Sequence, residues 1–388
     1  MYALILEFYA LLLTFLQYRM GVRTDEAKYL LDIPYPHPPL ARTILSSLDG
    51  LSGQEFFWRL VFATITVQAV WLVWDLSKDL KRLSRISLCL VWLLNTAVIG
   101  IAGSIMMSVL TALQELVLLW LLMRTHTKHT HIAALIALFW LGSLLTAYQA
   151  VLFSPLVLAA LLRERTSRMR ALLYFCVPLL VLFIYSLSNP LSLQSMFIHG
   201  AKNAGEALSV RLMDSLRLWA AGGSVVLSCV GTWGILRSRS WPLIATFVLT
   251  CAFILLSRID YYAILFTPLF LAGAFVLVRE QRASSTGLAL LTLAFSVMLL
   301  IFRPFHAGPS VARDVLSVIV AEHQQGPILM NGTFGHEWQY ESSDEIRRYN
   351  PELLTIAQAV VCLQACPEIN PSEWRRMPRV SVEVWVKL

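Results

Sequence analysis

The stretch Trp241–Glu280 reads WPLIATFVLTCAFILLSRIDYYAILFTPLFLAGAFVLVRE, and two long apolar runs fill almost all of it. Between Trp241 and Val278 only Arg258 and Asp260 carry a charge. A helix crosses a bilayer with roughly 17 to 25 apolar residues, and each run has about that length. The stretch therefore predicts two membrane-spanning helices joined by a short polar turn.

Similar runs recur along the rest of the chain. With these two included, we expect about eleven spans, near residues 2–18, 58–76, 86–103, 105–123, 132–147, 149–162, 171–187, 216–236, 241–257, 261–278 and 286–303. The 388 residues are 57% hydrophobic and only 14% charged, whereas a soluble domain carries about 25% charged residues. This composition excludes a disordered chain and a disulfide-stapled secreted module, and it disfavours a soluble enzyme. We expect a polytopic helical bundle in a membrane.

The basic residues predict how the bundle is oriented. If the N-terminus is cytoplasmic, fourteen Lys and Arg residues fall in short inner loops, at 77–85, 124–131, 163–170, 237–240 and 279–285. The short outer turns contain only Arg258. Positive charge is retained on the inner side of membranes, so the pattern predicts a multi-pass protein of a plasma membrane or bacterial inner membrane with its C-terminal part outside. The net charge of +7 is then an orientation signal, and we expect no nucleic-acid partner.

Residues 304–388 have the pattern of a small extracytoplasmic α/β domain, whereas residues 1–303 form the membrane region. Helical spacing covers 311–323, a strand-like run covers 327–330, and alternation V-S-V-E-V-W-V-K covers 380–387. Two cysteines of this domain, Cys362 and Cys366, could form a local disulfide in an oxidising compartment, although their spacing alone leaves this open.

The first outer loop, residues 19–57, contains the strongest candidate for a site. Its segment 22–42 reads VRTDEAKYLLDIPYPHPPLAR. Carboxylates at a membrane boundary are candidates for function, and Asp25 and Glu26 follow closely on the first span. The prolines restrict the backbone around His37, so the segment would hold an imidazole and Arg42 near the carboxylates. An ordinary solvated connector is the alternative.

Two motifs in this loop resemble a known family. D-E-A-K-Y at 25–29 and H-P-P-L-A-R at 37–42 look like the first outer loop of GT-C glycosyltransferases, in the branch of the protein O-mannosyltransferases and lipid A aminoarabinose transferases. Two supporting matches are W-R-L at 58–60 and the segment that begins Arg258-Ile-Asp-Tyr-Tyr. The resemblance implies a GT-C fold and transfer of a sugar from a polyprenyl-phosphate donor on the outer face.

The resemblance also implies roles for individual residues. Asp25 would be the base that deprotonates an acceptor hydroxyl, with Glu26 orienting it, and one working base with direct displacement predicts inversion at the anomeric carbon. The expected phosphate-binding residues are Arg59, then Arg258 and Tyr262, and the expected substrate-positioning residues are His37, Arg42 and Tyr29. No metal site is expected with certainty, although the two carboxylates could hold a divalent ion.

Other functions remain open at this point. A membrane transporter or a flippase for lipid-linked sugars is the main rival, but such proteins often have broken helices and charges near the bilayer midplane. The predicted spans are mostly uninterrupted, and the polar cluster lies in an outer loop, which favours an enzyme of cell-envelope glycosylation. The acceptor could be a protein, a lipid or a glycan.

Overall fold

The computed structural model describes residues 2–33, 37–47, 54–123, 130–164, 167–189, 191, 207–301, 310–321, 326–377 and 382–388. The chain divides into two compact units. The first comprises Met1–Thr14, Tyr35–Ile44 and Phe57–His306, and the second comprises Phe15–Pro34, Leu45–Phe56 and Ala307–Leu388. Parts of the predicted first outer loop therefore belong to the same unit as the C-terminal domain. The prolines at 34 and 36, the histidine-rich loop at 124–129 and most of the loop at 188–215 lie outside the described residues.

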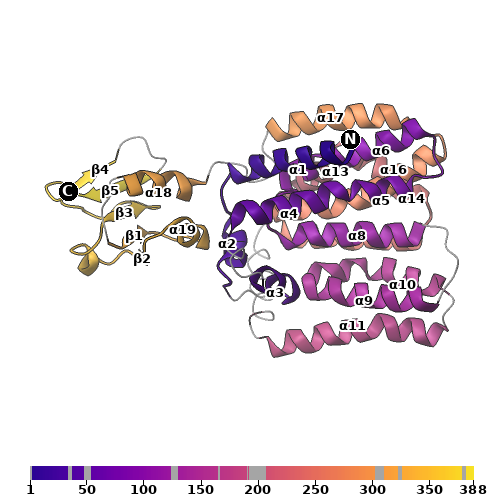
Figure 1. Cartoon of the computed structure of the whole chain (residues 1–388), viewed down its shortest axis with the longest axis horizontal. Coiled ribbons are helices and arrows are strands. Elements are labelled where there is room, and N and C mark those ends of the chain that lie inside the picture. The colour runs from indigo at the N-terminus through magenta and orange to yellow at the C-terminus, as the bar shows by residue number, and fades with distance from the viewer. Residues whose placement is uncertain are drawn as a thin grey trace. The chain divides into compact units, whose positions relative to one another are not determined.

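The first unit is a bundle of helices that run side by side (Figure 1). The helices that begin in it or supply most of their length to it are, in chain order, α1 (Tyr2–Tyr18), α3 (Leu40–Ser47), α4 (Glu55–Gln68), α5 (Val70–Leu76), α6 (Arg82–Leu93), α7 (Thr96–Ile101), α8 (Met107–Met123), α9 (Thr130–Thr146), η1 (Tyr148–Phe153), α10 (Ser154–Arg163), α11 (Arg168–Ser188), α13 (Leu208–Gly223), α14 (Val226–Arg237), α15 (Trp241–Ser257), η2 (Asp260–Leu265), α16 (Phe266–Arg279) and α17 (Ser285–Ile301). The prediction of a mostly helical chain is confirmed.

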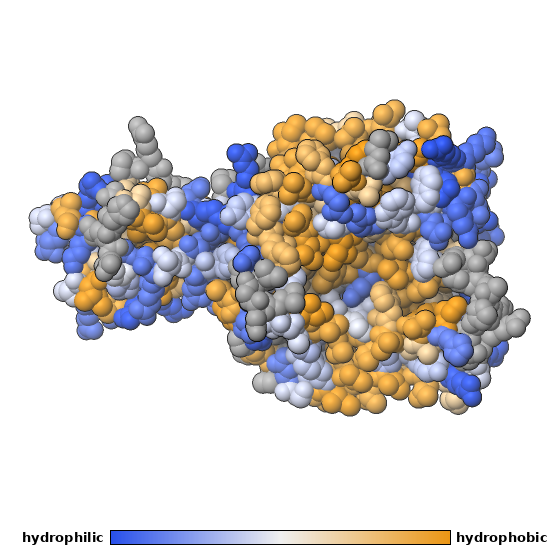
Figure 2. All heavy atoms as spheres, viewed as in Figure 1, coloured by the Kyte–Doolittle hydropathy of each residue, from blue (hydrophilic) through white to orange (hydrophobic). Residues whose placement is uncertain are grey.

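The bundle is apolar inside and out, which is the composition expected of a protein in lipid. In the most apolar part of the η2–α16 segment 94% of the stretch is buried, whereas in α11 only 17% is buried. Helix α16 is therefore central in the bundle and α11 is peripheral. Large apolar side chains such as Leu173, Phe183 and Ile184 are exposed on α11, and Figure 2 shows hydrophobic residues over most of the visible bundle surface. An exposed apolar area of this kind is disfavoured in water and suits contact with lipid.

Three helical segments of the described chain are long and apolar enough to cross a membrane: Glu55–Leu76, Arg168–Ser188 and Asp260–Arg279. A fourth is added if the bent pair α13–α14 counts as one span. Six further apolar helices have 10 to 17 residues. The predicted number of about eleven spans therefore stays a prediction.

The expectation of one uninterrupted span at 216–236 is wrong. Helices α13 and α14 meet at an angle of 93°, with Ser224 and Val225 both at positive φ. The hydroxyls of Ser224, Thr96 and Ser296 bond to one another at the break. The Gly222 carbonyl accepts hydrogen bonds from two further side chains, at 3.2 and 2.8 Å. Partners from distant parts of the sequence thus satisfy the polar groups that the break releases.

Helices α14 and α16 pack backbone against backbone. A Cβ on Gly234 would overlap the carbonyl of Gly273, and a Cβ on Gly273 would overlap the carbonyl of Gly231. Small residues allow such a close approach between helices in apolar surroundings. These glycines therefore fix how α14 lies on the central helix.

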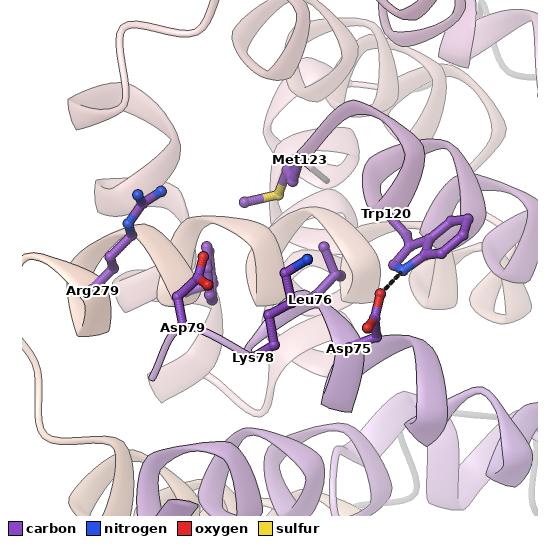
Figure 3. A pocket seen from close by; sticks show the side chains of 8 residues that line it. Asp75, Leu76, Lys78, Asp79, Trp120, Met123 and Arg279 are labelled. Atoms are coloured by element: carbon purple, nitrogen blue, oxygen red, sulfur yellow. Dashed lines mark hydrogen bonds between the residues drawn. The ribbon is translucent and has the colours of Figure 1, made fainter. Parts of the chain in front are cut away.

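The helix ends next to the predicted basic loops lie together at one end of the bundle. Arg237 Nε donates to Glu280 Oε2 at 2.9 Å, which joins the loop after α14 to the loop after α16. The guanidinium of Arg163 donates to the Leu122 carbonyl and so joins the end of α10 to the end of α8. The end of α5, the end of α8 and the last turn of α16 line one cavity (Figure 3). Which side of a membrane this end faces stays a prediction.

The C-terminal part of the second unit is a five-stranded sheet with helices on it. Its elements are α18 (Val311–Ala321), β1 (Ile328–Asn331), α19 (His336–Glu341), β2 (Ile346–Arg348), η3 (Pro351–Leu353), β3 (Ala359–Cys362), β4 (Trp374–Arg376) and β5 (Glu383–Lys387). The strand order is β2-β1-β3-β5-β4, with β2, β1 and β3 parallel and β5 antiparallel to both its neighbours. The predicted helix and both predicted strands are confirmed, whereas β2, β3 and β4 were not foreseen.

Both faces of the sheet bury apolar side chains. On one face Met330 and Val361 pack with Leu316 of α18 and with Trp338 of α19. The opposite face is smaller and includes Trp374. Cys362 and Cys366 form a disulfide, so the option that their spacing left open is realised. The predicted small α/β domain is thus a packed sheet with its own core.

Candidate functional site

Asp25 lies in the first turn of the seven-residue helix α2 (Thr24–Leu30), in the second unit. Its Oδ1 accepts a hydrogen bond from Lys28 Nζ at 3.0 Å, one turn later in the same helix. Acidic side chains are favoured in the first turn because the helix dipole is positive there. Asp25 is about a quarter exposed, so its carboxylate is both oriented and accessible.

Glu26, beside it, faces the other way. Its Oε2 accepts a hydrogen bond from the backbone N–H of Arg23 at 2.9 Å, which closes the start of α2. Glu26 is only 1% exposed. The geometry therefore gives Glu26 a capping task in α2. Its predicted role in orienting the acceptor stays a prediction.

Tyr29 and Arg42 were predicted to position the substrate. Tyr29 lies on the buried side of α2 and is 5% exposed. Arg42 is half-buried in the first turn of α3. This helix begins directly after the Pro38-Pro39 pair, and proline is common at the start of a helix. The predicted role of each in positioning the substrate stays a prediction.

In the first unit, His37 and Tyr262 both lie against the short helix η1. The His37 ring stacks on Tyr148 with 6.2 Å between ring centroids. The next residue, Gln149, donates its Nε2 to the Tyr262 hydroxyl at 2.6 Å. Tyr185 adds a hydroxyl at 3.5 Å from the His37 carbonyl. Two residues that are far apart in the sequence, and that were both predicted for the site, are therefore brought to the same element.

Arg258 ends helix α15 in a conformation that arginine rarely adopts. Its φ is +51°, in the left-handed region that favours glycine. Its Nη1 lies 3.5 Å from Asp214 Oδ2, and the side chain is 10% exposed. A strained backbone of this kind is often kept at functional positions. Arg258 also lies one turn before Tyr262, so the two predicted phosphate-binding residues are neighbours.

Arg59, the first choice for the phosphate, is completely buried. Its Nη1 donates to the Gly103 carbonyl at 3.1 Å, in the turn that joins α7 to α8. This hydrogen bond gives Arg59 a structural task. Helix directions also place the turn and η2 at the end of the bundle opposite the basic loops, because α8 and α16 run from there towards the cavity of Figure 3.

The predicted residues thus form two groups. Asp25, Glu26 and Tyr29 share helix α2 of the second unit, whereas His37, Arg42, Arg59, Arg258 and Tyr262 belong to the bundle. A single site that contains both groups stays a prediction.

The cavity in Figure 3 contains none of the predicted site residues. It has a volume of about 140 Å³ and is lined by Asp75, Leu76, Lys78, Asp79, Trp120, Met123, Phe275 and Arg279. Trp120 Nε1 donates to Asp75 Oδ2 at 2.7 Å within it. Of its charged residues, Lys78, Asp79 and Arg279 belong to the predicted inner loops, and Asp75 lies at the end of a predicted span. In the described part of the chain, no three or more His, Cys, Asp and Glu side chains converge as a metal site would require.

Sequence reasoning missed several partners. Tyr148, Gln149 and Asp214 contact predicted residues, yet each lies in a stretch that reads as an ordinary end of an apolar helix. Arg313 was also missed, because it falls on the polar side of a helix in the C-terminal domain. Only contacts between distant segments identify these residues.

No protein-family model and no curated protein sequence matches the chain. Solved structures do match its fold. The crystal structure of ArnT from Cupriavidus metallidurans in the apo state aligns with a TM-score of 0.63 and 14% sequence identity, over 99% of this chain and 97% of that chain. The same protein bound to undecaprenyl phosphate aligns with a TM-score of 0.63 and 14% identity, over 99% and 96%. The arabinofuranosyltransferase AftD from Mycobacteria has a lower TM-score of 0.48, with 15% identity, over 99% of this chain and 41% of that chain. ArnT is a GT-C lipid A aminoarabinose transferase, and this chain has the GT-C fold.

Proposed function

We propose that the chain is an integral-membrane glycosyltransferase that moves a sugar from a polyprenyl-phosphate donor to an acceptor hydroxyl. The observation that carries the proposal is the fold shared over 99% of the chain with ArnT, one of whose crystal structures has undecaprenyl phosphate bound. The first-loop motifs support it independently. The acceptor is a protein, a lipid or a glycan in the cell envelope.

Asp25 is proposed as the base. It would take the proton of the acceptor hydroxyl while that oxygen attacks the anomeric carbon and the lipid phosphate leaves. The carboxylate at the start of α2, about a quarter exposed, suits this task, and Lys28 holds it in one orientation. Direct displacement by one base would invert the configuration of the sugar. Glu26 would support the reaction by capping the helix that carries Asp25.

Arg258 and Tyr262 are proposed to bind the donor phosphate. A guanidinium binds phosphate through two parallel hydrogen bonds and so stabilises the charge of the leaving group. The left-handed backbone at Arg258 supports a functional reason for arginine there, where glycine would be less strained. Arg59 would act from the same end of the bundle, through the turn at Gly103. His37 and Arg42 would contact the donor sugar or the acceptor.

The proposed orientation follows from the charges. The end of the bundle that carries the basic loops would face the cytoplasm, and the end that carries η2 and Arg258 would face outward. The donor would then enter from the lipid with its phosphate at the outer surface. Hard divalent cations such as Mg²⁺ bind carboxylate oxygens, so a metal ion beside Asp25 is compatible with this scheme. No step of the scheme requires one.

A lipid-linked-sugar flippase is the second candidate, and the 93° break between α13 and α14 favours it, because transporters bind substrates at broken helices. However, the hydroxyls at this break are fully buried and bond to one another. Groups that satisfy one another are poorly placed to bind a substrate. The break is better explained as a structural joint, and the transferase remains the preferred function.

A reconstituted assay distinguishes the two. The purified protein in vesicles is supplied with a panel of polyprenyl-monophosphate sugars and with envelope lipids, glycans and proteins as acceptors. A transferase releases polyprenyl phosphate and adds one sugar mass to an acceptor. Movement of donor across the vesicle membrane without any such product would contradict the proposal and support the flippase.

A further inference from the structure

Arg313, on α18 of the C-terminal domain, is the centre of a charge cluster that the transfer scheme does not use. It donates to both carboxylate oxygens of Glu341, from Nε at 3.0 Å and from Nη2 at 2.7 Å. Its Nη2 also lies 2.5 Å from Glu55 Oε2, at the start of α4. Its Nη1 donates to the carbonyl of Tyr18, the last residue of α1, at 2.5 Å, and the guanidinium lies over the Tyr18 ring.

These contacts hold both ends of the first loop. Tyr18 precedes the loop and Glu55 ends it, so Arg313 connects the two ends through one guanidinium. Glu55 is 4% exposed and Glu341 is 10% exposed. Charge pairs at such depth are strong when they are well hydrogen-bonded, and removing one partner leaves a buried charge uncompensated. The backbone N–H of Glu55 is also bound, to the Tyr340 hydroxyl at 3.3 Å.

The same cluster holds helix α2. Glu341, which Arg313 fixes, accepts a hydrogen bond from the backbone N–H of Val22 at 3.4 Å, two residues before α2. Thr24, the first residue of α2, donates to Glu337 one turn earlier on α19. Gly335 lies so close that a Cβ there would overlap the Thr24 hydroxyl.

Helix α2 needs this support. An isolated helix of fewer than about 12 residues is marginal in water, and α2 has only seven. Its place is therefore set by what it packs on, and polar contacts from α19 fasten its first turn to the C-terminal domain. Arg313 in turn fixes Glu341, so the guanidinium acts on α2 through one intermediate residue.

We propose that Arg313 is a positioning residue that holds α2 so that Asp25 is presented in one orientation; this rests on the transfer function proposed above. Arg313 touches neither donor nor acceptor in this role. The C-terminal domain is then a support for the catalytic loop, through α18 and α19.

Three variants of the full-length protein in lipid nanodiscs test the proposal. Arg313→Met removes the charge and keeps the length, and a misplacement of about 1 Å predicts a loss in kcat of about 100-fold. The KM for the donor should stay within about twofold, because α2 contributes no phosphate contact in this scheme. Arg313→Lys keeps the charge without the two-pronged contact and should give an intermediate kcat. Arg347→Met is the matched control, since Arg347 is 41% exposed and pairs with the exposed Glu345 on the same strand end, and it should change neither kcat nor KM.

Hydrogen exchange supplies a readout that does not depend on activity. Backbone amides of residues 22–31 should lose protection in Arg313→Met and keep it in the control. Should Arg313→Met fail to fold, Glu341→Gln replaces it with the same expectations.

The outcomes separate this proposal from the proposed function. Unchanged protection of α2, or an unchanged kcat beside lost protection, overturns the positioning role. If the wild-type protein transfers no sugar, the proposed function fails, and the exchange measurement still decides whether Arg313 holds α2.

Discussion

The ammonium of Lys28 lies 3.0 Å from Oδ1 of Asp25, one turn apart on the same short helix. Lys28 therefore both balances the charge of Asp25 and limits its rotation. This relationship makes Lys28 a direct partner of the proposed base.

Lys28→Met should lower kcat about tenfold, because the Asp25 carboxylate would then sample several orientations. Lys28→Arg should retain most of the activity, since it keeps a cation at the same spacing. Steady-state kinetics on the reconstituted protein measure both. If Lys28→Met has the kcat of the wild-type protein, Lys28 does not orient the Asp25 carboxylate for the reaction.

Arg258→Gly separates the backbone of this residue from its side chain. Glycine adopts φ +51° without strain, so the variant should gain about 1 kcal/mol of stability while it loses the guanidinium. A lost charged hydrogen bond predicts a donor KM raised about 10- to 100-fold. Thermal unfolding in detergent tests the gain in stability, and steady-state kinetics with varied donor test the rise in KM. The matched variant Asp214→Asn should leave the donor KM within about twofold of the wild-type value. A rise as large as that in Arg258→Gly would mean that Arg258 acts through its ion pair with Asp214, and not by binding the donor phosphate.

Gly273→Val should destabilise the bundle by about 3 kcal/mol, because the new side chain would overlap the backbone of α14 at Gly231. Gly287→Ala is the control, since the nearest atoms there belong to Ser284 at 3.5 Å, an ordinary contact. Thermal unfolding of both variants gives the comparison. Equal unfolding temperatures would contradict the backbone-to-backbone packing of α14 on α16.

The Cys362–Cys366 disulfide closes a short loop after β3. Removing it with Cys362→Ser and Cys366→Ser together should cost about 2 kcal/mol, the entropy that a loop of this length predicts. Free-thiol counting on the unfolded protein, with and without reductant, checks the pairing. If the double variant unfolds at the same temperature as the oxidised wild type, the disulfide does not stabilise the sheet.

Much of the helical architecture was readable because lipid-facing helices carry their apolar character in continuous runs. The loop charges likewise predicted that the loops after α14 and α16 lie on the same side, and Arg237 contacts Glu280 between those two loops. Alternation at 380–387 identified β5, since a strand with one buried face repeats every two residues. Each of these features depends on residues that are close together in the chain, so one sequence is enough to recognise it.

The missed features depend on contacts between distant segments. Nothing near Ser224 predicts a bend of 93°, because the hydroxyls that stabilise it come from α7 and α17. Strands β2 and β4 have only three residues each, too few for a periodic pattern. Arg313 reads as an ordinary surface cation until Glu55 and Glu341 are brought to it. The first-loop motif located Asp25, but a sequence could not say what holds it.

The most direct test of the account is the product formed by wild type and by Asp25→Asn from one polyprenyl-monophosphate sugar. Wild-type protein should add one sugar to the acceptor, seen by mass spectrometry, with inverted configuration at the anomeric carbon by NMR. Asp25→Asn should be expressed and folded equally well and lose at least about 100-fold in kcat, as expected for a general base. Transfer by Asp25→Asn at the wild-type rate, or a product of retained configuration, would contradict the central claim.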